Sequence, residues 1–115
     1  MSISFDGFKE KTLTFKAAAG FDTAGVPVIV SAGNTVNECG IGDSFCGISK
    51  SFRNGLAAVQ LSGIVTIGYS GTAPSAGYNN LACNGAGKVS VASEGGREYL
   101  IVDVNTTKST VTFLL

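Results

Sequence analysis

Apolar and polar residues alternate in short segments along most of this chain, which is the pattern of β-strands that bury one face. The clearest alternation runs from Lys11 to Lys16, and a β-branched segment, Val26–Val30, follows it. Asn54-Gly55 separates two further apolar segments, and Asn-Gly is a strong signal for a two-residue hairpin turn. Since no longer window has a helical period, the pattern predicts an all-β protein.

The second half of the chain repeats the first half imperfectly. Sliding it back by 54 positions places Phe113-Leu114-Leu115 on Val59-Gln60-Leu61, and Tyr99–Val102 on Phe45–Ile48. We therefore predict a small β-barrel or β-clip-like domain with approximate internal duplication. Slips of one or two residues align further positions: Ala24-Gly25 with Ala76-Gly77, Val28 with Leu81, and Val36 with Val89.

The length of 115 residues fits one domain. We expect residues 17–115 to form a single β-barrel domain. Residues 1–16 belong to neither copy and are predicted to form an N-terminal arm or an edge strand. The apolar side chains of this segment are candidate anchors for a binding partner, and they are Ile3, Phe5, Phe8, Leu13 and Phe15.

The chain carries little charge. Charged residues make up 14% of it, against roughly 25% in an average soluble domain, and the formal net charge is zero. Nucleic-acid binding is not expected, because it needs a basic face that neutralises phosphates. A membrane span is not expected either, because no apolar segment approaches about 20 residues.

The residues offer little for catalysis, and we predict that the protein is not an enzyme. Histidine, the commonest general base and metal ligand, is absent. The eight carboxylates are scattered, which predicts no metal site, and no motif predicts a cofactor. Gly85–Lys88 resembles part of a phosphate loop, but Ala82 and Val89 stand where Gly and Ser or Thr are needed. A hydrolase with a Ser or Cys nucleophile would have only a carboxylate or a lysine to activate it.

Three cysteines are present: Cys39, Cys46 and Cys83. The N-terminus has neither the basic flank nor the apolar region of a secretion signal, so we expect a protein made in the cytoplasm and not secreted. Reduced, buried thiols are then the expectation. A Cys39–Cys46 disulfide is the alternative, and it requires Cα atoms within about 7 Å.

Several segments together resemble a known family. They are Pro27–Val30, Thr35-Val36, Gly47–Ser51, the turn Asn54-Gly55, and Ala58–Val65. In this order they are similar to the small head (capsid) decoration proteins of tailed bacteriophages, of the lambda type, and to prophage relatives. The ending from Gly96 to Leu115 also looks like the close of the prophage relatives.

The resemblance implies a non-enzymatic structural protein of the virion, located on the outer surface of the capsid. It would bind the major capsid protein and stabilise the head shell. Family members often form trimers, so self-association as a homotrimer is part of what the resemblance implies. An N-terminal arm contacts the shell in the lambda-type protein, and residues 1–16 are the corresponding segment.

Tyr69 and Tyr78 flank one loop and are further candidates for partner binding. They also support an alternative function, a carbohydrate- or receptor-binding β module of a phage fibre, in which both rings would stack on a sugar. Tyr99 lies in the middle of a predicted strand, so we expect it in the core.

Overall fold

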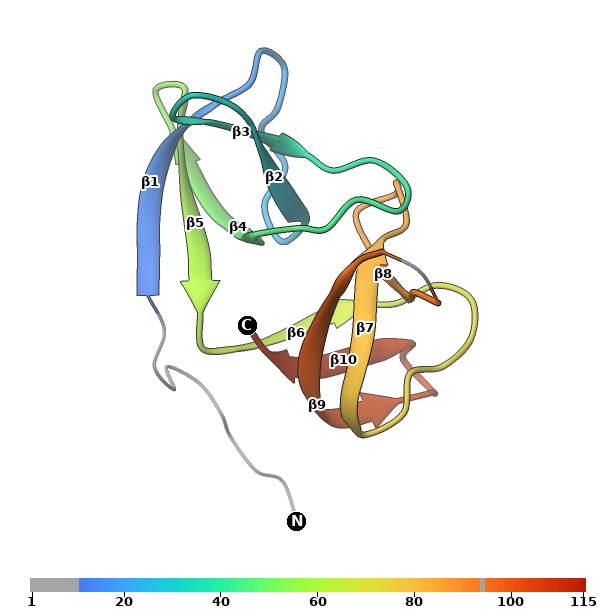
Figure 1. The fold of residues 1–115 in the computed structure, drawn as a ribbon. Helices are drawn as coiled ribbons and strands as arrows, with labels where there is room; N and C mark the ends of the chain where they lie inside the picture. Colours follow the sequence, from blue (N-terminus) through green and yellow to red (C-terminus); the bar gives the residue numbers. More distant parts are fainter. Residues whose placement is uncertain (1–10, 94) are drawn as a thin grey trace.

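The computed structural model describes residues 11–93 and 95–115, and these residues form ten β-strands and no helix. The strands make two five-stranded sheets, one from each half of the chain, and the first sheet closes into a barrel (Figure 1). The predicted all-β fold with a small barrel is confirmed.

The first unit (residues 11–62) has the strand order β1-β3-β2-β4-β5 around its barrel. Its strands are β1 (Lys11–Ala17), β2 (Pro27–Ala32), β3 (Thr35–Glu38), β4 (Gly47–Arg53) and β5 (Leu56–Ser62). β1 pairs antiparallel with β5, and parallel with β3 only at Lys16 and Ala17. The segment predicted as an arm or edge strand therefore enters the barrel at Lys11, while residues 1–10 lie outside the described part.

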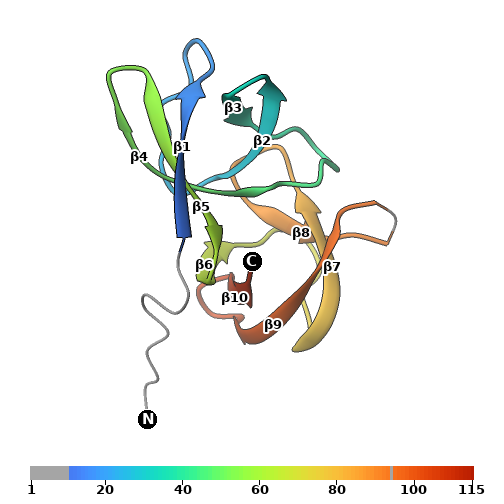
Figure 2. The same ribbon diagram turned by 60° about the vertical axis from the view of Figure 1, so that its left-hand side comes forward.

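The second unit (residues 64–115) has the sheet order β6-β10-β9-β7-β8. Its strands are β6 (Ile64–Gly68), β7 (Gly77–Cys83), β8 (Val89–Val91), β9 (Arg97–Asn105) and β10 (Thr110–Leu114). An isolated parallel bridge joins Tyr69, just after β6, to Val89 in β8. Figures 1 and 2 show the first unit above the second, with β5 leading directly into β6 where the units meet.

The two units have the same topology, strand for strand. In each unit, the first strand pairs antiparallel with the fifth strand. The residues at or just after the end of the first strand pair parallel with the third strand. Each unit also has a β-bulge at the same place in its last hairpin, where the register skips Lys50 in one unit and Val102 in the other. The duplication read from the sequence therefore extends to the fold.

The pairing register shows which residues are equivalent. It equates Val59 with Phe113, as predicted. On the preceding strand it equates Gly47 with Tyr99, whereas the sequence alignment placed Phe45 at this position. The difference arises because four residues link β9 to β10, against two between β4 and β5. This longer turn shifts the alignment by two positions.

The short turns follow their sequence signals. Asn54 and Gly55 link β4 to β5 with φ angles of 51° and 76°, and Asn34 has a φ of 59° between β2 and β3. Positive φ strains most side chains, and Gly and Asn tolerate it best. The predicted hairpin at Asn54-Gly55 is confirmed.

Each unit encloses a hydrophobic core. In the first unit, Phe21 meets Phe52 edge-on at 5.1 Å between ring centroids. The buried members of this first core are Phe21, Val26, Val28, Val36, Ala57 and Val59. The second core is larger, and its members from the second unit are Val65, Ile67, Tyr69, Leu81, Cys83, Val89, Tyr99, Ile101, Val111 and Phe113.

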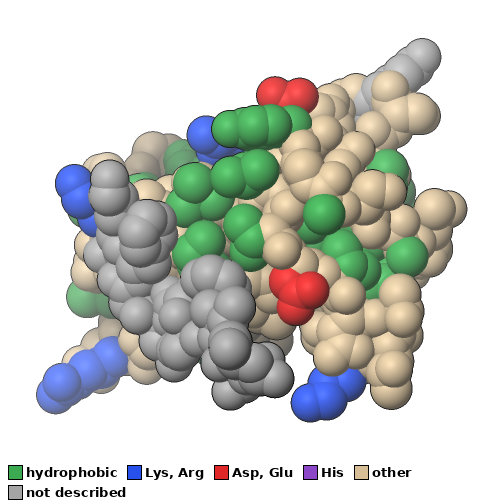
Figure 3. All heavy atoms as spheres, turned by 90° about the horizontal axis from the view of Figure 1, so that it is seen from below, with side chains coloured by type: hydrophobic (Ala, Val, Ile, Leu, Met, Phe, Trp, Pro, Cys, Tyr) green, Lys and Arg blue, Asp and Glu red, His purple; other side chains and the backbone are tan. Residues whose placement is uncertain are grey.

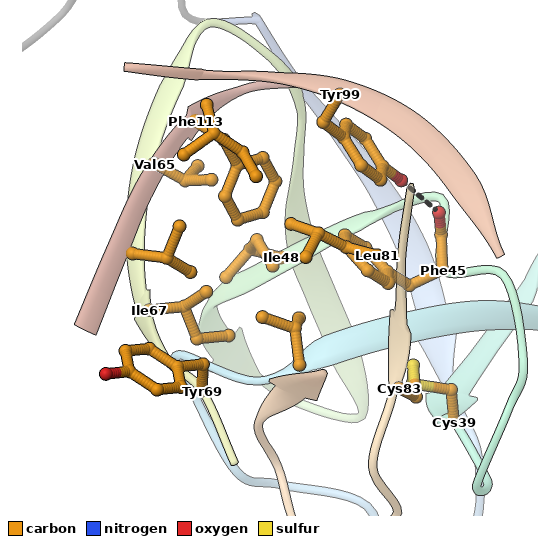
Figure 4. Close-up of a cluster of buried hydrophobic side chains, with 13 residues drawn as sticks. Cys39, Phe45, Ile48, Val65, Ile67, Tyr69, Leu81, Cys83, Tyr99 and Phe113 are labelled. Atoms are coloured by element: carbon orange, nitrogen blue, oxygen red, sulfur yellow. Dashed lines mark hydrogen bonds between the residues drawn. A yellow bond between two sulfur atoms is a disulfide. The ribbon is translucent and has the colours of Figure 1, made fainter. Parts of the chain in front are cut away.

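The first unit completes the second core. Phe45, just before β4, and Ile48, within β4, are buried among residues of the second unit (Figure 4). The Phe45 ring stacks on Tyr99 at 5.1 Å between centroids and meets Phe113 edge-on at 6.0 Å. These contacts, which we call the junction, pack the two units into one body.

The junction also contains a buried hydrogen bond. The Tyr99 hydroxyl donates to the backbone oxygen of Phe45 at 3.0 Å, the dashed line in Figure 4. Burial raises the pKa of Tyr99 to about 12, although the nearby Arg97 guanidinium acts in the opposite direction. The bond exists only while the hydroxyl is protonated. As predicted, Tyr99 is a core residue, with 2% of its surface exposed.

A disulfide adds a covalent link between the units. It joins Cys39, beyond β3, to Cys83 at the end of β7, and the two Cα atoms are 6.1 Å apart. The expectation of three reduced thiols is therefore wrong, and so is the alternative Cys39–Cys46 bridge, since Cys46 has a free thiol. Sequence spacing did not reveal the pairing because Cys39 and Cys83 lie in different copies and approach only after the units pack.

We predict that reduction of Cys39–Cys83 lowers the free energy of unfolding by roughly 4 kcal/mol, because the bridge spans a sequence separation of 44 residues. Chemical denaturation with and without a reductant measures this difference, and the Cys46→Ser variant is the control. Thiol counting on unfolded, unreduced protein should find one free thiol. Three free thiols would contradict the pairing.

Candidate protein-binding surfaces

The predicted anchors of the N-terminal segment fall into two groups. Ile3, Phe5 and Phe8 lie outside the described residues. Leu13 is 51% exposed on β1 and is available to a partner, whereas Phe15 packs against the first core. Of the described anchors, Leu13 is therefore the one that faces solvent.

The two candidate tyrosines have different environments. Tyr78 is 69% exposed on β7, but Tyr69 is only 7% exposed and belongs to the second core. A sugar-stacking face made of both rings is therefore wrong, because the Tyr69 ring is covered by its own protein. Tyr78 remains a candidate for contact with a partner.

Tyr78 ends a row of apolar side chains that crosses the outer face of the second sheet. The register places Ile64 opposite Leu114, Leu114 opposite Leu100, and Leu100 opposite Tyr78. Residues directly opposite in a sheet point to the same side. Ile64, Leu100 and Leu114 are half-buried, and Tyr78 is exposed. We call these four residues the apolar row.

Figure 3 looks at the molecule from below, toward the second unit. Hydrophobic side chains gather in the middle of this face, with acidic side chains and some Lys or Arg side chains around them. An antiparallel sheet with one solvated face normally carries polar residues there. The apolar row departs from that pattern, because three half-buried apolar side chains and the exposed Tyr78 lie side by side there. Contiguous apolar surface can mark an interaction site.

Three of the four positions in the equivalent row of the first unit are covered, and the fourth, Thr12, is exposed. Register places Thr12 opposite Gln60, Gln60 opposite Ile48, and Ile48 opposite Pro27, the same four positions as in the second unit. Gln60 and Ile48 are 2% and 6% exposed, Pro27 is fully buried, and Ile48 packs into the second core. The outer face of the first unit thus contributes to the junction, whereas the equivalent outer face of the second unit is in contact with solvent.

Two carboxylates flank the apolar row along β9. Glu98 precedes Leu100 by two residues on the same face, and Asp103 lies opposite Thr112 in the adjacent row. Both carboxylates are exposed, and neither forms an ion pair with another described residue. The uncovered face therefore combines an apolar centre with negative charge at its sides.

The first unit carries a hollow of about 390 Å³ on the outer side of its barrel. Its floor includes Leu56, which is 45% exposed, and Ala58. Register places Leu56 opposite both Lys16 and Arg53, so a cation stands on each side of this leucine. The residues lining the hollow are Thr14, Ser51, Arg53, Asn54, Leu56 and Ala58.

The described residues contain little reactive chemistry. Burial raises the pKa of the Cys46 thiol above its ordinary value, which disfavours the nucleophilic thiolate. The Ser49 hydroxyl donates to the backbone oxygen of Thr23 at 2.8 Å. Asp43 accepts a hydrogen bond from the Gly40 N–H at 2.9 Å, which makes it a loop-stabilising residue.

No group of three or more Cys, Asp or Glu side chains in residues 11–93 and 95–115 is placed to hold a metal ion. Within the same residues, no helix has the length and hydrophobicity needed to cross a membrane.

Sequence reasoning missed the apolar row and the hollow. A signal for the row was present in β9, where Tyr99 and Ile101 alternate with Leu100 and Val102, so both faces of the strand are apolar. The hollow had no such signal, because its residues converge only through the pairing of β1, β4 and β5.

No protein-family model and no curated protein sequence matches this chain. The functional interpretation therefore depends on the surfaces described above.

The equivalent positions Leu100 and Ile48 provide a matched pair of variants. Leu100→Lys is expected to change the free energy of unfolding by about 1 kcal/mol or less, because the new charge stays in water. Ile48→Lys is expected to cost more than about 3 kcal/mol, because it places a charge without a partner in the second core. Urea unfolding of both variants tests this assignment of the faces, and similar losses would contradict it.

Proposed function

We propose that this protein is a non-enzymatic structural component of a tailed-phage or prophage particle that binds the outside of the head shell as a capsid decoration protein. The observation that supports it is the apolar row. A chain that leaves Leu100, Leu114 and Tyr78 in a line on its outer sheet face is suited to assembly with another protein surface.

A structural role also agrees with the chemistry of the chain. Histidine is absent, and burial raises the pKa of the free Cys46 thiol, which disfavours its nucleophilic thiolate. The partner in this proposal is the major capsid protein, with other copies of the chain beside it. Weak contacts repeated over a lattice of identical subunits gain strength from multivalency.

The Cys39–Cys83 disulfide supports the proposed location on the virion surface. Disulfides persist in oxidising surroundings, which include the outside of virus particles, and are rare in the bacterial cytoplasm. On this proposal the chain is made in the cytoplasm, and the bridge stabilises it after the particle is released.

Co-sedimentation with empty, expanded head shells of the phage or prophage that encodes the chain tests the proposal. Wild-type protein at micromolar concentration is expected in the pellet with the shells. Leu100→Lys should reduce the bound fraction severalfold, because it charges the centre of the apolar row, whereas Lys108→Gln in the exposed β9–β10 turn should leave it unchanged. Wild-type protein that stays in the supernatant would refute the proposal.

A further inference from the structure

We infer that the apolar row of one copy docks onto the hollow in the first unit of a second copy, so that the chains associate head to tail. Head-to-tail association rests on the proposed function in one respect, because the apolar row is the binding surface in each case. The new element is the surface that the apolar row binds, which is the outer face around Leu56 and Ala58 on a second copy.

The charges of the two faces are complementary. On the second unit, an apolar side chain, Leu100, lies between the carboxylates of Glu98 and Asp103. On the first unit, an apolar side chain, Leu56, lies between the cations of Lys16 and Arg53. None of these four charged groups has an ion-pair partner among the described residues, so each remains available to a neighbouring molecule.

One face presents a projecting side chain and the other a hollow. Tyr78 is the most exposed member of the apolar row, at 69%, and stands at its end. The hollow is an open depression of about 390 Å³, and Leu56 and Ala58 are the apolar residues that line it. The hydroxyls of Thr14 and Ser51 line this hollow and offer hydrogen-bond partners to a phenol.

The same charges disfavour a symmetric dimer through the apolar row. A two-fold contact would bring the row of one copy onto the row of another, with Glu98 and Asp103 of both copies in one interface. Like charges facing each other across an interface are unfavourable. Head-to-tail contact avoids this repulsion, because the acidic face of one copy meets the cationic face of the next.

Head-to-tail association would also cover the outer row that stays open within one chain. The outer row of the first unit, with Gln60 and Ile48, is covered by the second unit. The outer row of the second unit would be covered by the first unit of another copy. A contact between two different faces closes into a ring or extends as a filament, according to its rotation.

Mixing two blocked variants tests this geometry without any capsid. Leu100→Lys blocks the apolar row and leaves the hollow intact, while Ala58→Arg fills the hollow and leaves the apolar row intact. Sedimentation velocity should show concentration-dependent oligomers for the wild type and for Lys108→Gln, and monomers for each blocked variant alone. The equimolar mixture should give a species of twice the monomer mass, because one intact row then meets one intact hollow.

Circular dichroism and urea unfolding establish that each blocked variant is folded, and Arg53→Glu replaces Ala58→Arg if the latter is not. A mixture that remains monomeric overturns the inference, as does a wild type that is monomeric at millimolar concentration. If the protein is monomeric but still sediments with shells, head-to-tail association is refuted and the proposed function stands. If the protein forms head-to-tail oligomers but does not bind shells, the proposed function is refuted and head-to-tail association stands.

Discussion

The fold depends on one arrangement: the second hydrophobic core is completed by residues of the first unit. Phe45 and Ile48 occupy the space beside Tyr99 and Phe113. Without them, the rings of Tyr99 and Phe113 would lose the aromatic contacts that Phe45 makes with both. The two copies therefore form one cooperative body, and the disulfide Cys39–Cys83 reinforces the same contact.

This arrangement explains why two units of the same topology have different outer faces. The row used at the junction contains Gln60. Its side-chain amide donates hydrogen bonds to the backbone oxygens of Ser62, at 3.0 Å, and Ile64, at 3.3 Å, in the segment that connects the two units. A buried amide is tolerated there because its hydrogen bonds are made. The equivalent position on the second unit is Leu114, a half-buried apolar side chain on a face that the described residues leave partly open.

Much of the fold is predictable from the sequence, because strands and turns depend on local patterns. The alternation in β1, the turn Asn54-Gly55 and the equivalence of Val59 with Phe113 are examples. The binding surfaces are less accessible, because they depend on strand register. Leu100 joins Leu114 and Tyr78 only through pairing across three strands, and the length of the β9–β10 turn shifts the alignment that the sequence suggests.

Tyr99 is sealed at the junction, with its hydroxyl hydrogen-bonded to the backbone oxygen of Phe45. A pH titration of the tyrosines, followed by NMR of the ring carbons, tests this arrangement most directly, with Tyr78 as an exposed reference. The raised pKa of about 12 predicts that Tyr99 remains protonated well beyond the usual pKa of 10.0, and that stability falls as pH rises between these values. Ionisation of Tyr99 near pH 10, together with an intact fold, would contradict the account.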